Sequence, residues 1–216
     1  TAGYTNTESS YNTFIGNAAG YTASGSGATQ LVYIGHNSGH LTTTATLNTG
    51  VGAQSLYTNT TGSENTAIGY NALQANTTGA NNVAVGSQAL DANTTAQHNV
   101  AMGKGALTTA TTGGFNTAIG GDTLAANTTA AGNTAVGFAA LDANTTGDFG
   151  TAVGYNALTS NTTSSSNVGV GYNAGQDATT GSQLVLIGTD AGKNITTGAR
   201  NTMLGYQAGD DLTTGS

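Results

Sequence analysis

Several residue types are missing or scarce in this sequence, and each absence narrows what the chain can be. Its 216 residues include no proline, cysteine or tryptophan, and only 6% of them are charged, against roughly 25% in typical soluble domains. Without cysteine there is no disulfide and no thiolate metal site, although this does not fix the compartment. Disordered chains are usually poor in β-branched residues. Here those residues are plentiful and regularly placed, so we expect an ordered protein.

Basic side chains are especially scarce. The chain has ten acidic residues and only three basic ones, Lys104, Lys193 and Arg200, which gives a formal net charge of −7. Binding to nucleic acid or to an anionic membrane surface requires clustered lysine and arginine, so neither partner is expected. No run reaches the roughly 18 apolar residues of a membrane span, so no membrane insertion is expected. The sequence begins at Thr1 without a visible signal peptide, as expected of a processed chain or a segment of a longer one.

What the sequence does contain is a repeat of 17 residues. One glycine recurs at that interval from Gly35 to Gly205, and an earlier copy at Gly16 lies 19 residues upstream, which predicts a two-residue insertion near residues 24–27. The best-preserved copy runs from Asn65 to Asn81, and we number its residues as positions 1 to 17. The twelve copies predict one repeat domain over residues 12–216, preceded by a lead-in at residues 1–11. Position 5 is the expected turn glycine, as at Gly69, Gly86, Gly103, Gly120, Gly137 and Gly154.

Positions 2 to 4 of each copy have the pattern of a short strand. Position 4 is aliphatic or Met in all twelve copies, and position 2 is always Thr or Val, which is the period of two that one strand face shows. Gly, Asn and Thr are poor helix formers, so a helix is not expected. A second extended segment is expected at positions 8 to 10, for example at Ala72-Leu73 and Ala89-Leu90.

A single copy buries too little apolar surface to be stable alone, so neighbouring copies must stack. We therefore predict an all-β fold, a parallel β-solenoid of twelve 17-residue repeats. With strands about 4.8 Å apart, the rod is on the order of 55 Å long.

Both faces of the predicted strand are apolar. If positions 2 and 4 fill the interior of the coil, position 3 lies on the opposite face, yet it is apolar or Gly in every copy. Strands covered on two sides show such runs, so we expect position 3 to contact another chain. The expected core residues are Ile68, Val85, Met102, Ile119, Val136, Val153, Leu73, Leu90 and Leu107, and the expected interface residues are Ala67, Ala84, Ala101, Ala118, Ala135 and Ala152.

Positions 3 and 9 vary together. Position 9 is Leu in copies three to nine and Gly in the other five, and position 3 is usually large where position 9 is Gly. Copy ten is an exception, because Gly169 and Gly175 are both small. This exchange indicates one close-packed space shared by the two positions, within a chain or across an interface. We expect Leu107→Gly combined with Ala101→Phe to be milder than either change alone.

The strings NTAIGYNAL, NNVAVGSQAL and NTAVGFAAL resemble head repeats of trimeric autotransporter adhesins, and still more the Asn-Thr-Ala-Val-Gly-Tyr repeats of phage and bacterial tail-fibre-domain proteins. The resemblance covers about residues 12 to 215. In the adhesin family each chain winds a left-handed parallel β-roll, and three rolls pack side by side around a common axis. The resemblance therefore implies a homotrimer outside the cell, on a cell surface or a virion. The unit here is longer than the adhesin repeat.

Three functions are compatible with such a rod. The first is a non-catalytic structural and attachment segment of an extracellular fibre. The alternatives are a self-polymerising surface filament, whose subunits stack end to end, and an ice-binding solenoid that presents threonine columns. Adjacent threonines of a strand point to opposite faces, so only one column is expected to be exposed. No nucleophile motif or phosphate-binding loop is recognisable, so neither an enzyme nor a cofactor is expected.

Several side chains are candidates for binding. The aromatic residues at position 6 are candidate contacts for a cell-surface glycan, or else pack over the neighbouring copy; they are Tyr70, Phe138, Tyr155 and Tyr172. The recurring Asn-Thr-Thr runs are either glycosylation sequons or turns with stacked side chains. His36 and His40 are expected to be surface turn residues and not metal ligands. Asp177, Asp190, Asp210 and Asp211 do not recur as in calcium-binding β-helices, so we expect solvated acids and no metal site.

Overall fold

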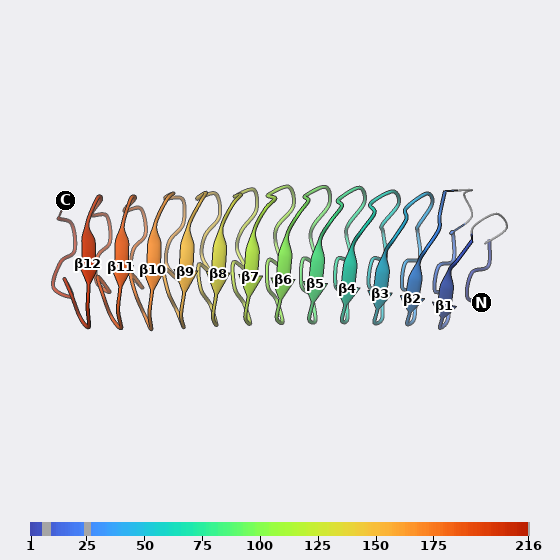
Figure 1. Cartoon of the computed structure of the whole chain (residues 1–216), viewed down its shortest axis with the longest axis horizontal. Coiled ribbons are helices and arrows are strands. Elements are labelled where there is room, and N and C mark those ends of the chain that lie inside the picture. Colours follow the sequence, from blue (N-terminus) through green and yellow to red (C-terminus); the bar gives the residue numbers. More distant parts are fainter. Residues whose placement is uncertain (6–9, 24–26, 216) are drawn as a thin grey trace.

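The chain forms a parallel β-solenoid in the computed structural model, which describes residues 1–5, 10–23 and 27–215 (Figure 1). Residues 24–26 of the predicted insertion lie outside the described residues. Each copy contributes one strand at positions 2 to 4, and the twelve strands form one parallel sheet in chain order. They are β1 (Thr13–Ile15), β2 (Val32–Ile34), β3 (Thr49–Val51), β4 (Thr66–Ile68), β5 (Val83–Val85), β6 (Val100–Met102), β7 (Thr117–Ile119), β8 (Thr134–Val136), β9 (Thr151–Val153), β10 (Val168–Val170), β11 (Val185–Ile187) and β12 (Thr202–Leu204). The predicted all-β solenoid of tandem repeats is confirmed.

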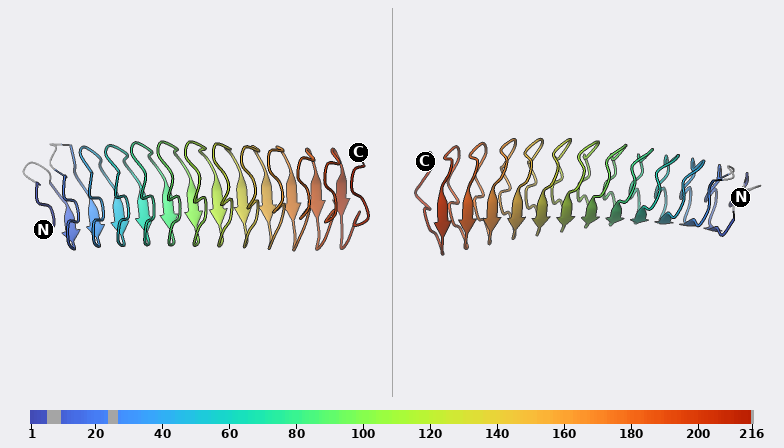
Figure 2. Two further views of the ribbon diagram at one scale, coloured as in Figure 1. Left: turned by 180° about the vertical axis from the view of Figure 1, so that it is seen from behind. Right: turned by 45° about the horizontal axis from the view of Figure 1, so that its top comes forward.

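The turns stack in register along one direction. Each strand residue pairs with the residue at the same position of the next copy, as Ala67 does with Ala84. We number each turn, or rung, by its strand. The two chain ends lie at opposite ends of the rod (Figures 1 and 2). Residues 1–5 also pack on the solenoid, because the Gly3 amide donates to the Ala19 carbonyl at 2.8 Å and Tyr4 stacks on Tyr21.

The glycine at position 5 is required by its backbone and by its neighbour. Gly86 has a φ of +137°, in a region that residues with a side chain rarely adopt. A Cβ atom on Gly86 would lie 2.5 Å from the carbonyl oxygen of Gly103 in the next rung. The same two conditions recur along the column from Gly16 to Gly188. The predicted role of this glycine, a positive φ with close backbone approach, is confirmed.

The assignment of the two strand faces was wrong, because the column expected at an interface lies in the core and the column expected in the core lies on the outside. Position 3 points into the coil, and Ala67, Ala84, Ala101, Ala118, Ala135 and Ala152 are all 0% exposed within a single chain. Position 4 points outward. The residues expected in the core there are half exposed or partly exposed, at 41% for Ile68, 42% for Met102, 38% for Ile119 and 38% for Val153, with Val85 and Val136 intermediate.

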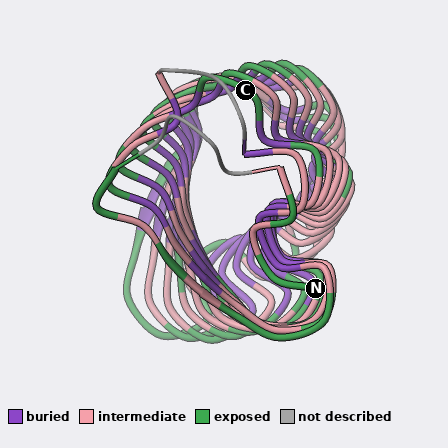
Figure 3. Ribbon diagram, turned by 90° about the vertical axis from the view of Figure 1, so that its right-hand side faces the viewer, coloured by how far each residue is buried: buried purple, intermediate pink, exposed green. Residues whose placement is uncertain are grey.

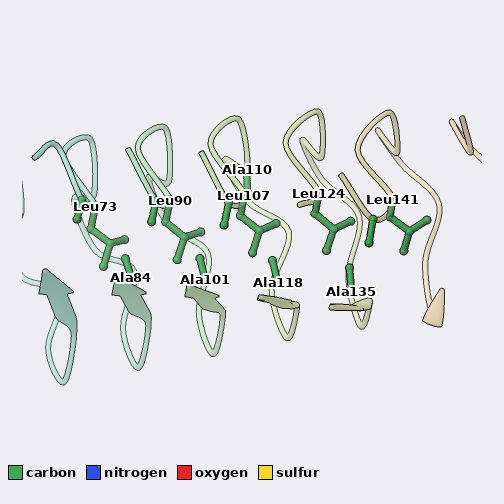
Figure 4. Close-up of a cluster of buried hydrophobic side chains, with 14 of the residues drawn as sticks. Leu73, Ala84, Leu90, Ala101, Leu107, Ala110, Ala118, Leu124, Ala135 and Leu141 are labelled. Carbon is green, nitrogen blue, oxygen red and sulfur yellow. The ribbon is translucent and has the colours of Figure 1, made fainter. Parts of the chain in front are cut away.

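Alanine at position 3 faces the interior because the leucine of position 9 fills that interior from the wall opposite the sheet. Leu73, Leu90 and Leu107 are fully buried, as predicted, and point across the coil towards the alanines of position 3 (Figure 4). Viewed along the rod, the buried segments line the inside of the coil and the exposed segments form its outer corners (Figure 3). Beside a leucine the interior has room for a methyl group at position 3. The larger side chain of position 4 therefore lies outside.

The wall opposite the sheet is a turn and not the second extended segment that was predicted. Positions 7 and 9 both have left-handed backbone conformations, with φ of 57° at Asn71 and 51° at Leu73. This conformation costs roughly 1–2 kcal/mol for a residue with a side chain. All seven leucines of position 9 adopt it, at φ of 51° to 53°. Burial of the leucine side chain, worth roughly 1.5–3 kcal/mol, offsets this strain.

The exchange between positions 3 and 9 takes place inside one chain. A Cβ atom on Gly20 would lie 2.6 Å from the Phe14 ring. A Cβ atom on Gly192 would lie 2.7 Å from Leu186 in the same rung and 2.9 Å from Met203 in the next rung. Each side chain at position 3 is therefore packed between the position-9 residues of its own rung and of the preceding rung.

This neighbour relationship also explains the exception in copy ten. Rung 10 lies where position 9 changes from Leu158 to Gly175, and its position 3 is Gly169. The opposite change, from Gly39 to Leu56, occurs at rung 3, where position 3 is Gly50. At both boundaries a large side chain from the adjacent rung occupies the space.

Candidate functional site

The outer sheet face is an uncharged surface that runs along the solenoid. We define it as the side chains of positions 2 and 4 in strands β1 to β12. All of these residues are Thr, Val, Ile, Leu or Met, and none is charged. The aliphatic column is partly exposed along its length and most exposed at the two ends, at 57% for Ile15 and 75% for Leu204.

A face that is uncharged throughout and carries an unbroken column of aliphatic or Met side chains at position 4 is uncommon on a protein that has no partner. Monomeric proteins rarely expose contiguous apolar patches above a few hundred Å², and larger ones mark interaction sites. Acidic residues lie at other positions of the repeat, as Asp91 and Asp142 do at position 10. Two copies of the chain could therefore bring their outer sheet faces together without opposing like charges.

Sequence reasoning misplaced this face although a signal was present. Position 2 is Thr in seven of the twelve copies, for example at Thr66 and Thr117. A hydroxyl group in the core needs a hydrogen-bond partner, whereas alanine at position 3 does not. The preference for Thr at position 2 was therefore the indication that positions 2 and 4 face outward.

The aromatic residues of position 6 lie on the surface, next to the outer sheet face in sequence. Phe138, Tyr155 and Tyr172 stack on one another, with ring centroids 5.4 Å and 5.5 Å apart. They remain about half exposed, at 48%, 47% and 51%. Tyr70 is separate from them, between the short side chains of Ala53 and Ser87. Tyr155 is stacked on both faces and presents mainly its edges, whereas Phe138 and Tyr172 are each stacked on one face.

The asparagines of the Asn-Thr-Thr runs are structural. Asn59, Asn76 and Asn93 are 0% exposed, and each amide nitrogen donates to the asparagine oxygen of the preceding rung or to a backbone carbonyl of its own turn. Asn127, Asn144 and Asn161 are equally buried. A glycan could not be attached to these nitrogens in the folded chain. A second asparagine ladder runs along position 1, where the Oδ1 atom of Asn65 accepts a hydrogen bond from the backbone N–H of Asn82 at 3.0 Å and from its side-chain Nδ2 at 3.2 Å.

The two threonine columns at positions 13 and 14 differ in their environment. Hydroxyl groups of position 13 donate to the backbone of the next rung, as Thr77 does to the Thr94 carbonyl at 3.0 Å. Position 14 is exposed in all eleven copies from Thr44 to Thr214. One threonine column is therefore exposed along its whole length, although positions 13 and 14 lie outside the strands to which the alternation argument applies.

The histidines and acids do not assemble into a site. His40 is stacked between Tyr21 and Tyr57, at 5.0 Å and 5.1 Å, while His36 is exposed. Burial raises the pKa of the carboxyl groups of Asp91 and Asp142, and in the second case the neighbouring Asp122 adds to the effect. The described residues contain no cluster of three His, Cys, Asp or Glu that could hold a metal, and their surface has no enclosed pocket.

No helix within the described ranges is suited to cross a membrane. Comparisons with protein-family models, with curated proteins and with solved structures return no match for this chain.

Proposed function

We propose that this chain is a non-catalytic, rod-shaped segment of an extracellular fibre, and that three copies associate side by side through their outer sheet faces. The observation that carries the proposal is the exposure of Ile68, Met102, Ile119 and Val153 on a face without any charged residue. Association would remove this apolar surface from water, at roughly 25 cal/mol for each Å² buried. The face runs along the whole rod, so the gain increases with the number of rungs.

Parallel association suits a repeat structure. Every rung presents the same arrangement at positions 2 and 4, so parallel copies in register place each rung against its equivalent. The repeats that this sequence resembles occur in trimeric fibres, which supports three copies and an extracellular location. Such a bundle contributes length and stiffness, and the position-6 aromatic residues remain available for attachment to a glycan receptor.

A cysteine cross-link tests this proposal cleanly because the chain has no cysteine of its own. Ile119→Cys places a thiol on the outer sheet face, and Thr112→Cys places one on the exposed position-14 column. Under mild oxidation we expect Ile119→Cys to form disulfide-linked chains and Thr112→Cys to remain largely single. If neither variant cross-links, and both thiols react at the same rate with a maleimide, the faces are not in contact.

Ice binding is a second candidate, favoured by the exposed threonine column. Position 14 repeats one hydroxyl and one methyl group at the strand spacing, about 4.8 Å, which is close to the oxygen repeat along the basal axis of ice. Thermal hysteresis of the purified protein tests this. Hysteresis that disappears in Thr112→Lys and persists in Lys104→Thr would establish it, and a freezing point equal to that of buffer would exclude it.

A further inference from the structure

The columns of positions 6 and 7 have one gap in the middle of the rod. Gly121 is the only glycine among the twelve residues of position 6, and Gly105 is the only glycine among those of position 7. They lie in adjacent rungs, 7 and 6. Gly105 is buried and the Asp122 carboxylate occupies the room beside it, whereas Gly121 is only partly buried and leaves position 6 of rung 7 without a side chain. We call this open surface gap at Gly121 the rung-7 slot.

One wall of the slot is an aromatic ring with a free face. Phe138 stacks on Tyr155 at 5.4 Å with an interplanar angle of 19°, which covers one face of its ring. On the other side, its Cδ2 and Cε2 atoms lie 3.4 Å and 3.6 Å from the place where a Cβ of Gly121 would stand. The uncovered face is therefore turned towards the missing side chain of rung 7. In rungs 8 to 10 each stacked ring of this column occupies one rung, so the slot has the thickness of one ring.

The other wall is polar. Lys104, at position 6 of rung 6, is exposed, and the one ion pair in the described part of the chain joins Lys193 and Asp190 instead. The Oδ1 atom of Asp122 lies 2.6 Å from the place where a Cβ of Gly105 would stand, so its carboxylate uses the room that this glycine leaves. The Asp122 amide donates to the Lys104 carbonyl at 2.9 Å, which fixes the two residues beside each other.

We propose that the rung-7 slot binds a single hexopyranose ring. The C–H face of a pyranose fits the free face of Phe138, its hydroxyl groups can donate to the Asp122 carboxylate, and they can accept from the Lys104 ammonium group. The two charges are opposite, which favours a neutral sugar over an ionic one. The slot therefore selects a ligand that is one ring thick, has one apolar face and carries hydroxyl groups around its edge.

The slot refines the position-6 strip into one defined site. Tyr155, in the middle of the stack, offers only its edges, whereas Phe138 offers a face together with polar partners. An open slot that contacts one ring binds weakly, with a dissociation constant on the order of 1 mM. A bundle with several slots gains avidity on a surface with many sugars. The slot is complete within one chain, so sugar binding and the proposed association can fail independently.

Saturation-transfer-difference NMR tests this proposal with methyl β-glucopyranoside, methyl β-galactopyranoside, methyl α-mannopyranoside and methyl N-acetyl-β-glucosaminide. The decisive variant is Gly121→Phe, which fills the slot with the ring that rung 8 carries. Gly121 has no positive φ, and a Cβ there meets its neighbours at 3.4 Å or more, so this variant should fold. Phe138→Ala removes the wall, and Tyr70→Ala is the matched control that removes an isolated exposed ring.

We expect saturation transfer to at least one of the four glycosides, reduced at least fivefold by Gly121→Phe and by Phe138→Ala and unchanged by Tyr70→Ala. Circular dichroism should be the same for all variants. The proposal is overturned if none of the four glycosides shows transfer to the native chain. It is equally overturned if Gly121→Phe retains the signal, or if Tyr70→Ala loses as much signal as Phe138→Ala.

Discussion

The Cγ atom of Leu158 lies 2.7 Å from the point where a Cβ of Gly169, in the next rung, would stand. Alanine occupies position 3 in the six preceding rungs, from Ala67 to Ala152, so a consensus argument would favour Gly169→Ala. The structure predicts the opposite. Gly169→Ala should lower the free energy of unfolding by about 1–3 kcal/mol, because it overpacks the core.

This prediction has an internal control. In a Leu158→Ala background the extra methyl group has room, so adding Gly169→Ala there should cost much less. Urea unfolding of the four proteins of this cycle measures the coupling. Equal costs in both backgrounds would show that the two residues do not contact.

The same neighbour relationship sharpens the exchange between positions 3 and 9. Ala101 is packed between Leu90 and Leu107, so Ala101→Phe alone should be strongly destabilising. Leu107→Gly relieves a left-handed leucine, worth roughly 1–2 kcal/mol, but leaves a cavity. We expect the pair to be milder than either change alone and the triple variant with Leu90→Gly to be milder still. Denaturant midpoints that fall additively with each substitution would rule out the shared space.

The asparagine ladder of position 12 has a gap that can be repaired. Ala110 interrupts it, and the Oδ1 atom of Asn93 is buried without a hydrogen-bond partner. Ala110→Asn should place an amide nitrogen on that oxygen, as Asn93 itself does for Asn76 at 2.8 Å.

We expect Ala110→Asn to stabilise the fold by about 1 kcal/mol, the typical net value of a buried hydrogen bond. Ala110→Leu is the control, since it fills the same volume without a donor. Thermal unfolding midpoints compare the three proteins. A midpoint for Ala110→Asn at or below that of Ala110→Leu would argue against the ladder as a source of stability.

Sequence periodicity predicted the strands, the turn glycines and the stacking, because each depends on a residue type that recurs at a fixed interval. It could not decide which strand face is inside. A period of two separates Ala67 from Thr66 and Ile68, but the choice depends on what the opposite wall contributes. Leu73 occupies most of the interior, so alanine faces it and isoleucine lies outside.

The backbone of position 9 was the other feature that sequence reasoning missed. Leucine rarely adopts a positive φ, so the backbone preference of leucine favoured an extended segment at position 9. The signal was the replacement of Leu by Gly at this position in five copies, for example at Gly39 and Gly192, since glycine accepts the left-handed conformation without strain. For the candidate site, the sequence identified the position-6 aromatics, but the free face of Phe138 depends on Gly121 and required the structure.

The raised pKa of the buried Tyr33 phenol determines how the free energy of unfolding changes at alkaline pH. Burial raises the pKa of its phenol from 10.0 to about 12, and the Thr42 hydroxyl donates to its oxygen at 3.0 Å. Between these two values the unfolded chain loses the proton while the folded chain keeps it. The stabilisation is therefore complete below about pH 10 and is lost as the pH rises to about 12, and it amounts to roughly 3 kcal/mol.

Tyr33→Phe provides the comparison for this effect. It removes the titrating group, so its free energy of unfolding should decline less than that of the native chain between pH 9 and pH 12. Urea midpoints at several pH values measure the difference. Parallel declines for the two proteins would show that Tyr33 does not control the alkaline transition.

The molar mass of the native chain in solution tests the association through the outer sheet face most directly. Light scattering on a sizing column at micromolar concentration should give three times the 21.1 kDa of one chain. Met102→Lys together with Ile119→Lys should give a folded single chain, since both side chains already point outward. A native mass of 21.1 kDa, assemblies of open-ended size, or a lysine variant that keeps the trimer mass would contradict the account.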